Sequence, residues 1–304
     1  MMFMDTSAPP YRSGFVAVMG KPNVGKSTLV NALLGQKIAA VSPRPQTTRR
    51  RQLGILTLDS AQLIFVDTPG MHKPRYKLGE SMVKHATEAL SDCDVILMLV
   101  DASQPPDEAD NQLATLVNNF TGRAPVFLLL NMIDKIEPAV LVQHTQAYQE
   151  LLPGGTSVAI SATRRDGLDY LLHTLISYLP ISPALYPEGQ VTDLFEKEIA
   201  ADLIREAALI TLYDEVPHGI GVRIDQYTER AEHGAYIEAT IFVERESHKA
   251  IVIGQGGSML KQIGSKARQQ IEEMSNRKVY LQLKVKVSKN WRNDAKSLRW
   301  FGYE

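Results

Sequence analysis

The stretch Gly20-Lys21-Pro22-Asn23-Val24-Gly25-Lys26-Ser27 decides the fold of this 304-residue chain. It fits the pattern G-x-x-x-x-G-K-[ST] and lies between an apolar run, 15–19, and a helical pattern, 27–34. A strand, a glycine-rich loop and a helix N-terminus in this order form a phosphate-binding loop, or P-loop, since backbone N–H groups and the helix dipole face the anion. A turn that binds nothing is the alternative, and the flanking strand and helix argue against it.

Two side chains of the P-loop have the chemistry that a nucleoside triphosphate requires. Lys26 can reach the β- and γ-phosphates, and the hydroxyl of Ser27 can bind Mg²⁺. We therefore predict a nucleotide site with Lys26 as a catalytic residue. In and directly after the P-loop, the residues predicted to contact the nucleotide are Gly20, Lys21, Pro22, Asn23, Val24, Gly25, Lys26, Ser27 and Thr28.

Apolar runs alternate with helical patterns over residues 14–180, which predicts an α/β domain with a doubly wound, mostly parallel sheet. The predicted strands are 15–19, 53–58, 63–67, 95–100, 126–130 and 157–160. The predicted helices are 27–34, 79–90, 107–120, 138–151 and 168–179. Ligands of such sheets bind at the carboxyl ends of strands, and the remaining motifs fall there.

The motif Asp67-Thr68-Pro69-Gly70 follows the third predicted strand. A carboxylate here can hold Mg²⁺, and the N–H of a glycine can contact a γ-phosphate. D-x-x-G is a weak signal alone, but its distance behind a P-loop makes it strong. The predicted nucleotide contacts are Asp67, Thr68, Pro69 and Gly70, with Asp67 and Ser27 binding Mg²⁺ and Gly70 assisting catalysis.

The motif Asn131-Met132-Ile133-Asp134 ends the strand 126–130 and has features of a purine site. The carboxylate of Asp134 can accept hydrogen bonds from guanine N1–H and the exocyclic amine. Adenine lacks the N1–H, so ATP would leave Asp134 with an unpaired buried charge. Ser161-Ala162-Thr163 follows the next strand, where a backbone N–H can meet guanine O6. An ATP-dependent enzyme, in which Asp134 is structural, is the rival hypothesis.

These four segments, in this order, resemble the nucleotide-binding domain of the translation-factor-like GTPases. The resemblance implies that Asn131, Met132, Asp134, Ser161, Ala162 and Thr163 bind the guanine end of GTP. Methionine replaces the lysine of the usual N-K-x-D at position 132. Its apolar side chain can still cover the base, which implies guanine selection with weaker affinity.

Hydrolysis needs a device other than the glutamine that Ras-type GTPases use, because Met71 occupies that position. The resemblance offers Asn23, which in GTPases with this P-loop form can hold K⁺ near the phosphates. Thr48, in the proline- and arginine-rich loop 42–51, is predicted to close onto Mg²⁺ and the γ-phosphate, with Thr47 as the alternative. Arg44 and Arg49 of this loop are expected to be solvated or to contact RNA, with a role as charge donors in hydrolysis as the alternative.

Repeated prolines mark a linker after the first domain, because they prevent a helix. The predicted organisation is a tail (1–13), a GTPase domain (14–180), a linker (181–192), a second domain (193–288) and a C-terminal tail (289–304). The second domain is predicted to start with a helix capped by Thr192-Asp193 and ending near residue 213. Two strands, 221–227 and 236–243, with a turn at 229–234, and a final strand at 279–287 complete it.

A helix, two strands, two helices around Gly254-Gln255-Gly256-Gly257 and a final strand resemble a type II KH domain, a small α+β fold. In such domains a G-x-x-G turn lets the RNA backbone approach closely. The predicted RNA contacts are Ile253, Gly254, Gln255, Gly256, Gly257, Lys261 and Lys266. Residues 245–304 contain 13 Lys and Arg against 5 Asp and Glu, so this segment carries +8 within a chain of net charge −1. A polyanion partner fits this separation, and a solvated basic face is the alternative.

A GTPase domain followed by a type II KH domain resembles the Era family over nearly the whole chain, including Pro45-Gln46-Thr47-Thr48-Arg49, Glu215-Val216-Pro217-His218 and Leu298-Arg299-Trp300-Phe301-Gly302-Tyr303. The resemblance implies a Mg²⁺-dependent GTPase that cycles between GTP and GDP, binds the 3′ end of 16S ribosomal RNA and assists assembly of the 30S subunit. Action on another RNA, such as that of the large ribosomal subunit, is the main alternative. A pure RNA-binding protein with a nucleotide-free first domain is a further one.

Composition favours the cytoplasm, since a single cysteine excludes an internal disulfide and no apolar run is long enough to span a bilayer. The N-terminus also lacks the pattern of a secretory signal. Peripheral attachment to the inner face of the membrane is a property of Era relatives, and RNA binding explains the basic segments equally well. We expect a monomer.

Overall fold

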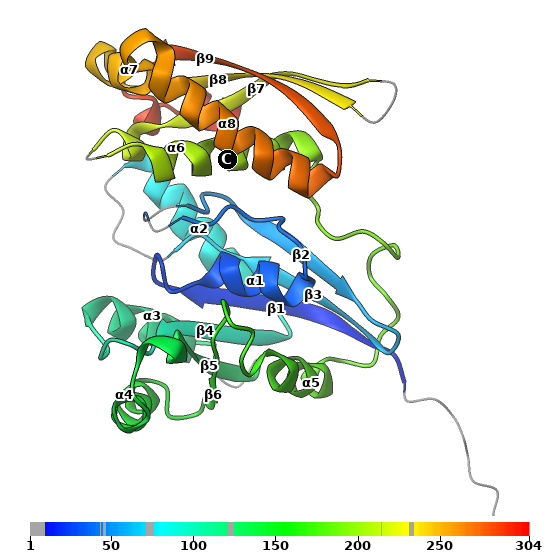
Figure 1. Ribbon diagram of the computed structural model, residues 1–304. Helices are drawn as coiled ribbons and strands as arrows, with labels where there is room; N and C mark the ends of the chain where they lie inside the picture. The colour runs from blue at the N-terminus through cyan, green and yellow to red at the C-terminus, as the bar shows by residue number, and fades with distance from the viewer. Residues whose placement is uncertain are drawn as a thin grey trace, which may run out of the picture.

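The computed structural model describes residues 10–42, 44, 47–70, 76–120, 124–213, 215–230 and 234–303. Two sheets, each with its own helices, lie one above the other, and an extended segment joins them along one side (Figure 1). Met71 and the prolines and glutamine at positions 43, 45 and 46 lie outside the described residues, as do the first nine residues and part of the turn predicted at 229–234.

The first sheet has six strands in the order β2-β3-β1-β4-β5-β6. Its strands are β1 (Arg12–Gly20), β2 (Gln52–Thr57), β3 (Ala61–Asp67), β4 (Val95–Asp101), β5 (Val126–Asn131) and β6 (Thr156–Ala159). All pairs are parallel except the hairpin of β2 and β3. The predicted doubly wound, mostly parallel sheet is confirmed.

Helices cover both faces of this sheet and form its two cores. The helices are α1 (Lys26–Leu34), α2 (Lys77–Ser91), α3 (Glu108–Asn118), α4 (Pro138–Leu151) and α5 (Leu168–Tyr178). Apolar side chains of α1 and α5 pack on one face, and those of α2, α3 and α4 pack on the other. The central strands are buried on both faces, which explains their continuous apolar sequences.

The second sheet has three strands in the order β7-β8-β9. Its elements are α6 (Glu196–Thr211), β7 (Gly221–Arg230), β8 (Gly234–Val243), α7 (Glu246–Ile253), α8 (Ser258–Ser275) and β9 (Lys278–Val287). β7 pairs with β8 antiparallel and β8 with β9 parallel. Helices α6 and α8 share one core with this sheet. This order matches the predicted type II KH fold.

Two predicted boundaries in this domain are wrong. Helix α6 starts at Glu196, and its N-cap is Phe195 rather than Thr192 or Asp193. The carboxylate of Asp193 instead accepts a hydrogen bond from the Leu53 N–H at 2.9 Å, so it covers the edge strand β2 of the first sheet. The turn predicted from residue 229 starts later, because β7 continues through Arg230.

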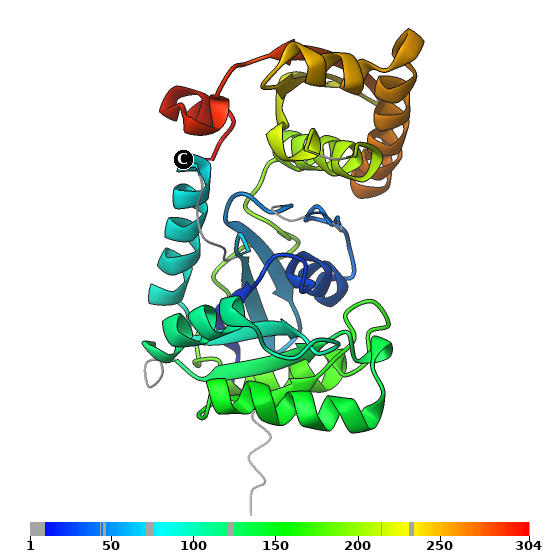
Figure 2. The same cartoon turned by 90° about the vertical axis from the view of Figure 1, so that its left-hand side faces the viewer.

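The C-terminal segment folds against the first domain, although the sequence predicted no structure for it. A short helix, α9 (Ala295–Trp300), follows a helical turn, η4 (Trp291–Asn293). Trp291, Phe301 and Tyr303 are buried in one cluster with Leu78 and Met82 of α2. Figure 2 shows this segment beside the N-terminal end of α2, where the Ser81 hydroxyl donates a 2.7 Å hydrogen bond to the Tyr303 carbonyl.

None of the helices that the structure describes is both long and apolar enough to cross a lipid bilayer.

Candidate nucleotide and RNA sites

The P-loop connects β1 to α1, and its conformation depends on Gly25. Gly25 has a φ of 98°, and a Cβ at this position would lie 2.4 Å from Nδ2 of Asn131. Only glycine tolerates both the left-handed backbone and the close approach. Asn131 therefore crosses directly over the loop at the end of β5.

Lys26 is buried beneath the P-loop, and its ammonium group donates to the carbonyls of Gly20 and Lys21 at 3.1 and 3.0 Å. Desolvation lowers the pKa of Lys26 to about 8, and the nearby charge of Asp67 opposes this shift. A bound phosphate would supply the missing anionic partner. The geometry therefore fits a phosphate-binding lysine.

The carboxylate of Asp67 and two hydroxyls form the predicted metal site. Oδ2 of Asp67 accepts hydrogen bonds from Ser27 Oγ at 2.7 Å and Thr48 Oγ1 at 3.3 Å, and the two hydroxyl oxygens are 2.8 Å apart. Oδ1 of Asp67 is buried without a hydrogen-bond partner among the described residues, and burial raises the pKa of this carboxyl. Hard oxygen ligands converging on an unsatisfied carboxylate fit Mg²⁺. The described residues contain no cluster of three His, Cys, Asp or Glu that could hold a metal, and the site at Asp67 has one carboxylate and two hydroxyls instead.

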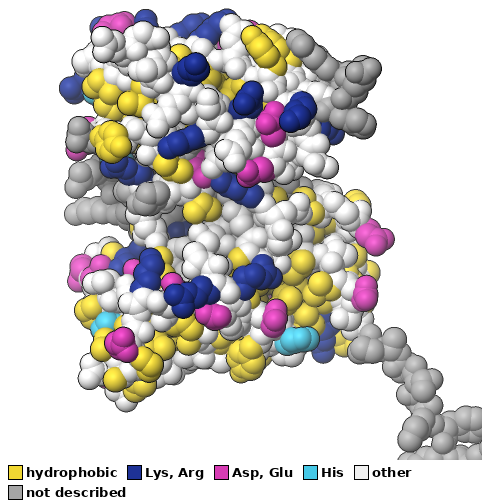
Figure 3. All heavy atoms as spheres, in the orientation of Figure 1, with side chains coloured by type: hydrophobic (Ala, Val, Ile, Leu, Met, Phe, Trp, Pro, Cys, Tyr) yellow, Lys and Arg dark blue, Asp and Glu magenta, His cyan; other side chains and the backbone are white. Residues whose placement is uncertain are grey.

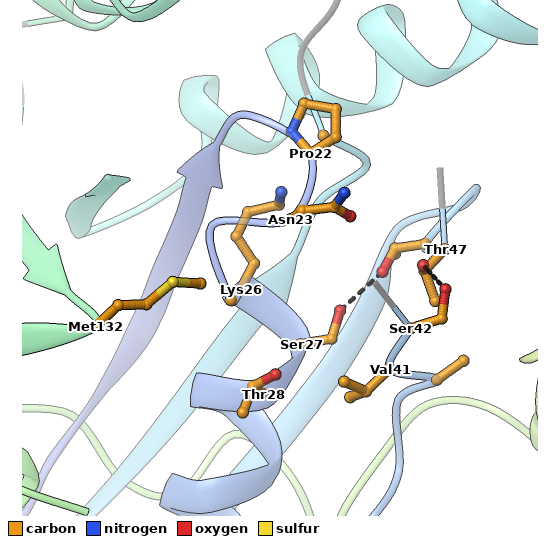
Figure 4. Close-up of a pocket in the computed structure, with 13 residues that line it drawn as sticks. Pro22, Asn23, Lys26, Ser27, Thr28, Val41, Ser42, Thr47 and Met132 are labelled. Atoms are coloured by element: carbon orange, nitrogen blue, oxygen red, sulfur yellow. Dashed lines mark hydrogen bonds between the residues drawn. The ribbon is translucent and has the colours of Figure 1, made fainter. Parts of the chain in front are cut away.

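A pocket of about 110 Å³ opens at this point, and Figure 4 shows Lys26, Ser27 and Met132 around it. Its predicted members are Pro22, Asn23, Gly25, Lys26, Ser27, Thr28, Thr48, Gly70 and Met132. Sequence reasoning missed Ala40 and Val41, which belong to no motif. It placed Ser42 in the predicted loop without a role and kept Thr47 only as an alternative. The volume accommodates phosphates rather than a complete nucleotide.

Asn131 joins the phosphate end of the site to the base end. Its Nδ2 donates to the Val24 carbonyl at 2.8 Å, and its Oδ1 accepts from the Ala162 N–H at 3.0 Å. Both polar ends of this buried side chain are thus used inside the protein. Asn131 supports the site by holding the P-loop and the segment after β6 together.

Asp134 lies at the far end of the site, next to Ser161. The Ser161 hydroxyl donates to Asp134 Oδ1 at 2.7 Å and lowers the pKa of Asp134, and Arg164 lowers it further. Asp134 is therefore a carboxylate at neutral pH and acts only as an acceptor. Guanine offers two donors on its N1–C2 edge, so this arrangement fits guanine and does not fit adenine.

Met132 adopts a left-handed conformation, with a φ of 67°. Its sulfur lies 3.4 Å from Nζ of Lys135, and in Figure 4 its side chain extends toward the P-loop. A cation from the next turn therefore lies beside the Met132 side chain, and the role of Met132 as a cover for the base stays a prediction.

The side chains of two other predicted contacts, Lys21 and Thr68, bond to other parts of the protein and do not line the pocket. The ammonium of Lys21 is turned away to Asp110 and Asp107 of the α3 N-terminus, at 2.7 and 2.8 Å. The Thr68 hydroxyl donates to the Val18 carbonyl at 2.7 Å. The pocket lining also excludes Gly20, Val24, Pro69 and Thr163.

Arg49 is buried, so the expectation that it is solvated is wrong, whereas Arg44 is half-buried. Nη2 of Arg44 donates to the Leu212 carbonyl at 3.2 Å, and Arg49 is only 2% exposed. Both side chains are turned into the second domain, where carbonyl oxygens accept from Nη2 of Arg44 and from Nη1 and Nη2 of Arg49. An RNA contact or a charge donated to the phosphates would require either side chain to leave this position.

A groove of about 380 Å³ in the second domain lies between α8 and β9. Its lining consists of Gly257, Leu260, Lys261, Gly264, Ser265, Arg268, Leu281 and Leu283. The basic residues Lys261, Lys266 and Arg268 fall in the first eleven residues of α8, and both of its acidic residues lie in its last four. Figure 3 shows basic side chains over this face of the molecule.

The G-x-x-G turn forms the end of this groove. Gly254, Gly256 and Gly257 have φ values of 72°, 57° and 80°, so three of its four residues have backbones that favour glycine. Of the predicted RNA contacts, Gly257 and Lys261 line the groove. Lys266 lies roughly 140° around α8 from Lys261 and points elsewhere. Sequence reasoning missed Leu260, Arg268, Leu281 and Leu283, which one face of the helix and the alternation of β9 would have indicated.

Comparison with known proteins agrees with both sites. Residues 15–132 match a family described as "50S ribosome-binding GTPase", and residues 215–292 match one described as "KH domain". The chain is 45% identical to GTPase Era of Ruminiclostridium cellulolyticum over 294 residues, which cover 97% of this chain and 98% of that protein. This chain belongs to the Era family of GTPases.

Solved structures of Era proteins support the assignment. One is a crystal structure of Era in complex with MgGDPNP and nucleotides 1506–1542 of 16S ribosomal RNA, and another is a variant of Aquifex aeolicus Era bound to GDP.AlF4-. Each is 40% identical to this Era-family chain, has a TM-score of 0.90, and is matched over 96% of this chain and 99% of its own. This Era-family protein is therefore a GTPase with a KH domain, and GTP, GDP and Mg²⁺ are its ligands.

Proposed function

We propose that this GTPase is a switch that binds the 3′ end of 16S ribosomal RNA through its KH domain and assists assembly of the small ribosomal subunit. The observation that carries the proposal is the presence, in one chain, of a guanine-type nucleotide site and a basic groove ending in a G-x-x-G turn. The Era complex with 16S RNA, similar over almost the full length, supports the choice of RNA.

In the nucleotide half, each residue would have a distinct task. Lys26 neutralises the phosphates, Asp134 selects guanine and Asn131 keeps these two parts in register. Ser27, Thr48 and Asp67 would hold Mg²⁺, which neutralises charge on the phosphates when it is bound.

Hydrolysis would depend on the P-loop rather than on a glutamine. We include Asn23, which lines the phosphate pocket with a φ of 68°, as the residue that holds K⁺ near the phosphates. Thr48 and Gly70 line the same pocket and would contact the γ-phosphate.

In the RNA half, the groove combines apolar and cationic groups. Leu281 and Leu283 give it an apolar floor, and Lys261 and Arg268 stand at its side. Single-stranded RNA needs this combination, because splayed bases pack on apolar surface while phosphates attract cations. The adjoining turn has open space above Gly256 and Gly257, where an RNA backbone can approach.

Crosslinking tests the choice of RNA. Protein irradiated on total cellular RNA should yield crosslinked fragments that map to the 3′ end of 16S RNA. A variant with Lys261→Glu and Arg268→Glu should lose these fragments while it keeps GTP binding. Fragments from the large ribosomal subunit would contradict the proposed target and favour the target named for the family that matches residues 15–132.

The proposed RNA places the protein where ribosomes are assembled, in the cytoplasm, and a monomer suffices for the switch. Peripheral binding to the inner membrane face would use the same basic segments. Sedimentation with anionic vesicles, with and without competing RNA, would show whether lipid and RNA exclude each other.

A further inference from the structure

Residues 47–50 connect the phosphate end of the nucleotide site to the KH domain. Thr48 faces the proposed metal site, with its hydroxyl 2.8 Å from Ser27 Oγ. Arg49 faces the opposite direction, and its Nη1 donates to the Ile220 carbonyl at 2.7 Å. Two consecutive residues thus have their side chains in two different domains.

The guanidinium of Arg49 occupies an enclosed site at the start of β7. Its Nη2 donates to the His218 carbonyl at 3.2 Å, and its Cζ lies 5.6 Å from the Trp291 ring and 5.8 Å from the Tyr303 ring. Trp291 also donates from Nε1 to the Gly219 carbonyl at 2.9 Å. Carbonyls and aromatic faces therefore hold the two terminal nitrogens, Nη1 and Nη2, in a fixed orientation, while Nε is buried without a hydrogen-bond partner among the described residues.

The buried charge of Arg49 is stabilised by contacts that require one orientation of its side chain. Among the described residues, no carboxylate forms an ion pair with Arg49. Desolvation lowers the pKa of Arg49 to about 10, and Tyr303 partly opposes the shift. A buried cation held by backbone carbonyls, aromatic rings and the Tyr303 side chain is stable in one orientation, and a shift of the backbone breaks its contacts.

Helix α6 holds the rest of the same segment. Arg50 pairs with Glu198 and Asp202 at 3.4 and 3.0 Å, and Arg205 donates to the carbonyl of Thr47. These α6 residues are spaced by four and three positions, which places them on one face of the helix.

The same face of α6 reaches the RNA-binding helix. Glu206 accepts hydrogen bonds from Lys37 Nζ at 2.7 Å and from the Val41 N–H at 2.9 Å, both in the first domain. It also accepts one from Gln270 of α8 at 2.8 Å. A continuous set of packed contacts therefore runs from Thr48 through α6 to the helix that lines the RNA groove.

We propose that Arg49 is the positioning residue that couples the nucleotide site to the KH domain, because it ties Thr48 to the start of β7. The inference rests on the proposed switch function and names the residue that carries it. Thr48 already lies at the proposed metal site, and consecutive Cα atoms are about 3.8 Å apart, so a movement of Thr48 away from this site after loss of the γ-phosphate must displace Arg49. Either the start of β7 follows, or the guanidinium leaves its site, and both change how the domains contact each other.

Coupling is reciprocal, so it can be measured from the nucleotide side. We would measure the affinity of full-length protein for a non-hydrolysable GTP analogue and for GDP, each with and without a saturating oligonucleotide of the 16S 3′ end. In the wild type, RNA should change the ratio of the two affinities by at least about fivefold. In Arg49→Ala protein, RNA should change this ratio by less than about twofold. Arg49→Lys keeps the charge but lacks the planar guanidinium with its two terminal donors, so its change should be intermediate.

Arg51→Ala is the matched control, because Arg51 is an exposed arginine directly after this segment. It should keep the wild-type coupling. GDP affinity and the melting temperature of each variant show whether it is folded, and Arg49→Lys decides the result if Arg49→Ala does not fold.

Different results would overturn the role of Arg49 and the switch function. Full coupling in folded Arg49→Ala or Arg49→Lys protein would overturn the role of Arg49 and leave the switch intact. Loss of coupling in Arg51→Ala to the same extent would also overturn it. Wild-type protein whose nucleotide affinities do not respond to bound RNA would overturn the switch itself, and the role of Arg49 with it.

Discussion

Lys26 is a buried cation whose pKa, about 8, lies below its ordinary value of 10.5. The nucleotide-free protein should therefore gain stability as the pH rises from about 8 to 10.5, since the unfolded chain keeps a proton that folded Lys26 has lost. Phosphates favour the charged form, so nucleotide binding at pH 8.5 should take up more than about half a proton, against almost none at pH 6.5. Calorimetry of GTP-analogue binding in buffers of different ionisation enthalpy measures this uptake. Equal uptake at the two pH values would contradict this account of Lys26.

Asp134 should determine which purine is bound. In Asp134→Asn protein, the amide N–H₂ can turn toward the base, where it repels the guanine amine and matches the carbonyl that xanthine has at C2. GTP affinity should fall by roughly 100-fold and XTP affinity should rise. Competition between the two nucleotides against a fluorescent analogue measures the exchange. An unchanged preference for GTP would show that other groups select the base.

Local pattern predicted the side chains that converge on the candidate site better than those that hold its loops together. Lys26, Ser27 and Asp67 converge as expected, because strand ends in one sheet must meet at the same edge. The bracing role of Asn131 was not predictable. Its partners lie 107 and 31 residues away, and no local spacing indicates them.

Because of its P-loop, the protein should hydrolyse GTP at a rate that depends on which monovalent cation is present. If Asn23 holds K⁺ beside the phosphates, the hydrolysis rate in KCl should exceed that in NaCl severalfold, since the cation neutralises charge that develops in the transition state. Asn23→Ala should remove the difference and leave GDP binding within a few fold. Equal wild-type rates in the two salts would rule out this role.

The turn between α7 and α8 should be sensitive to its first glycine. A Cβ at Gly254 would lie 2.7 Å from Cβ of Met259, and φ and ψ of 72° and 171° are strained for other residues. Gly254→Ala should therefore cost about 3 kcal/mol of unfolding free energy. Gly256→Ala, where the Cβ meets open space, should cost about 1 kcal/mol. Denaturant unfolding compares them, and equal losses would contradict this explanation.

Elements were predictable where periodicity was strong. All six strands and five helices of the first domain appear at the predicted places, because apolar runs and turn residues alternate clearly. The start of α6 was wrong, since Asp193 had a longer-range partner in Leu53. The C-terminal segment was missed because its apolar residues are stabilised by α2, more than 200 positions earlier in the sequence.

The arrangement of the two domains lay beyond sequence reasoning. Arg49 looks like a surface arginine in a charged loop, yet the carbonyl it bonds is 171 residues away. No composition or spacing rule connects the two positions. The sequence did indicate a nucleotide site and an RNA site in one chain. In our proposal, the contacts of Arg49 between the two domains couple these sites.

In the proposed switch, the guanine nucleotide that the protein binds determines its affinity for RNA. The most direct test is the dissociation constant of a labelled oligonucleotide from the 16S 3′ end, measured with saturating Mg²⁺ and either a GTP analogue or GDP. We predict specific binding that is at least about fivefold tighter in one nucleotide state than in the other. Identical dissociation constants in the two states, or no preference for this oligonucleotide over a scrambled one, would contradict the account.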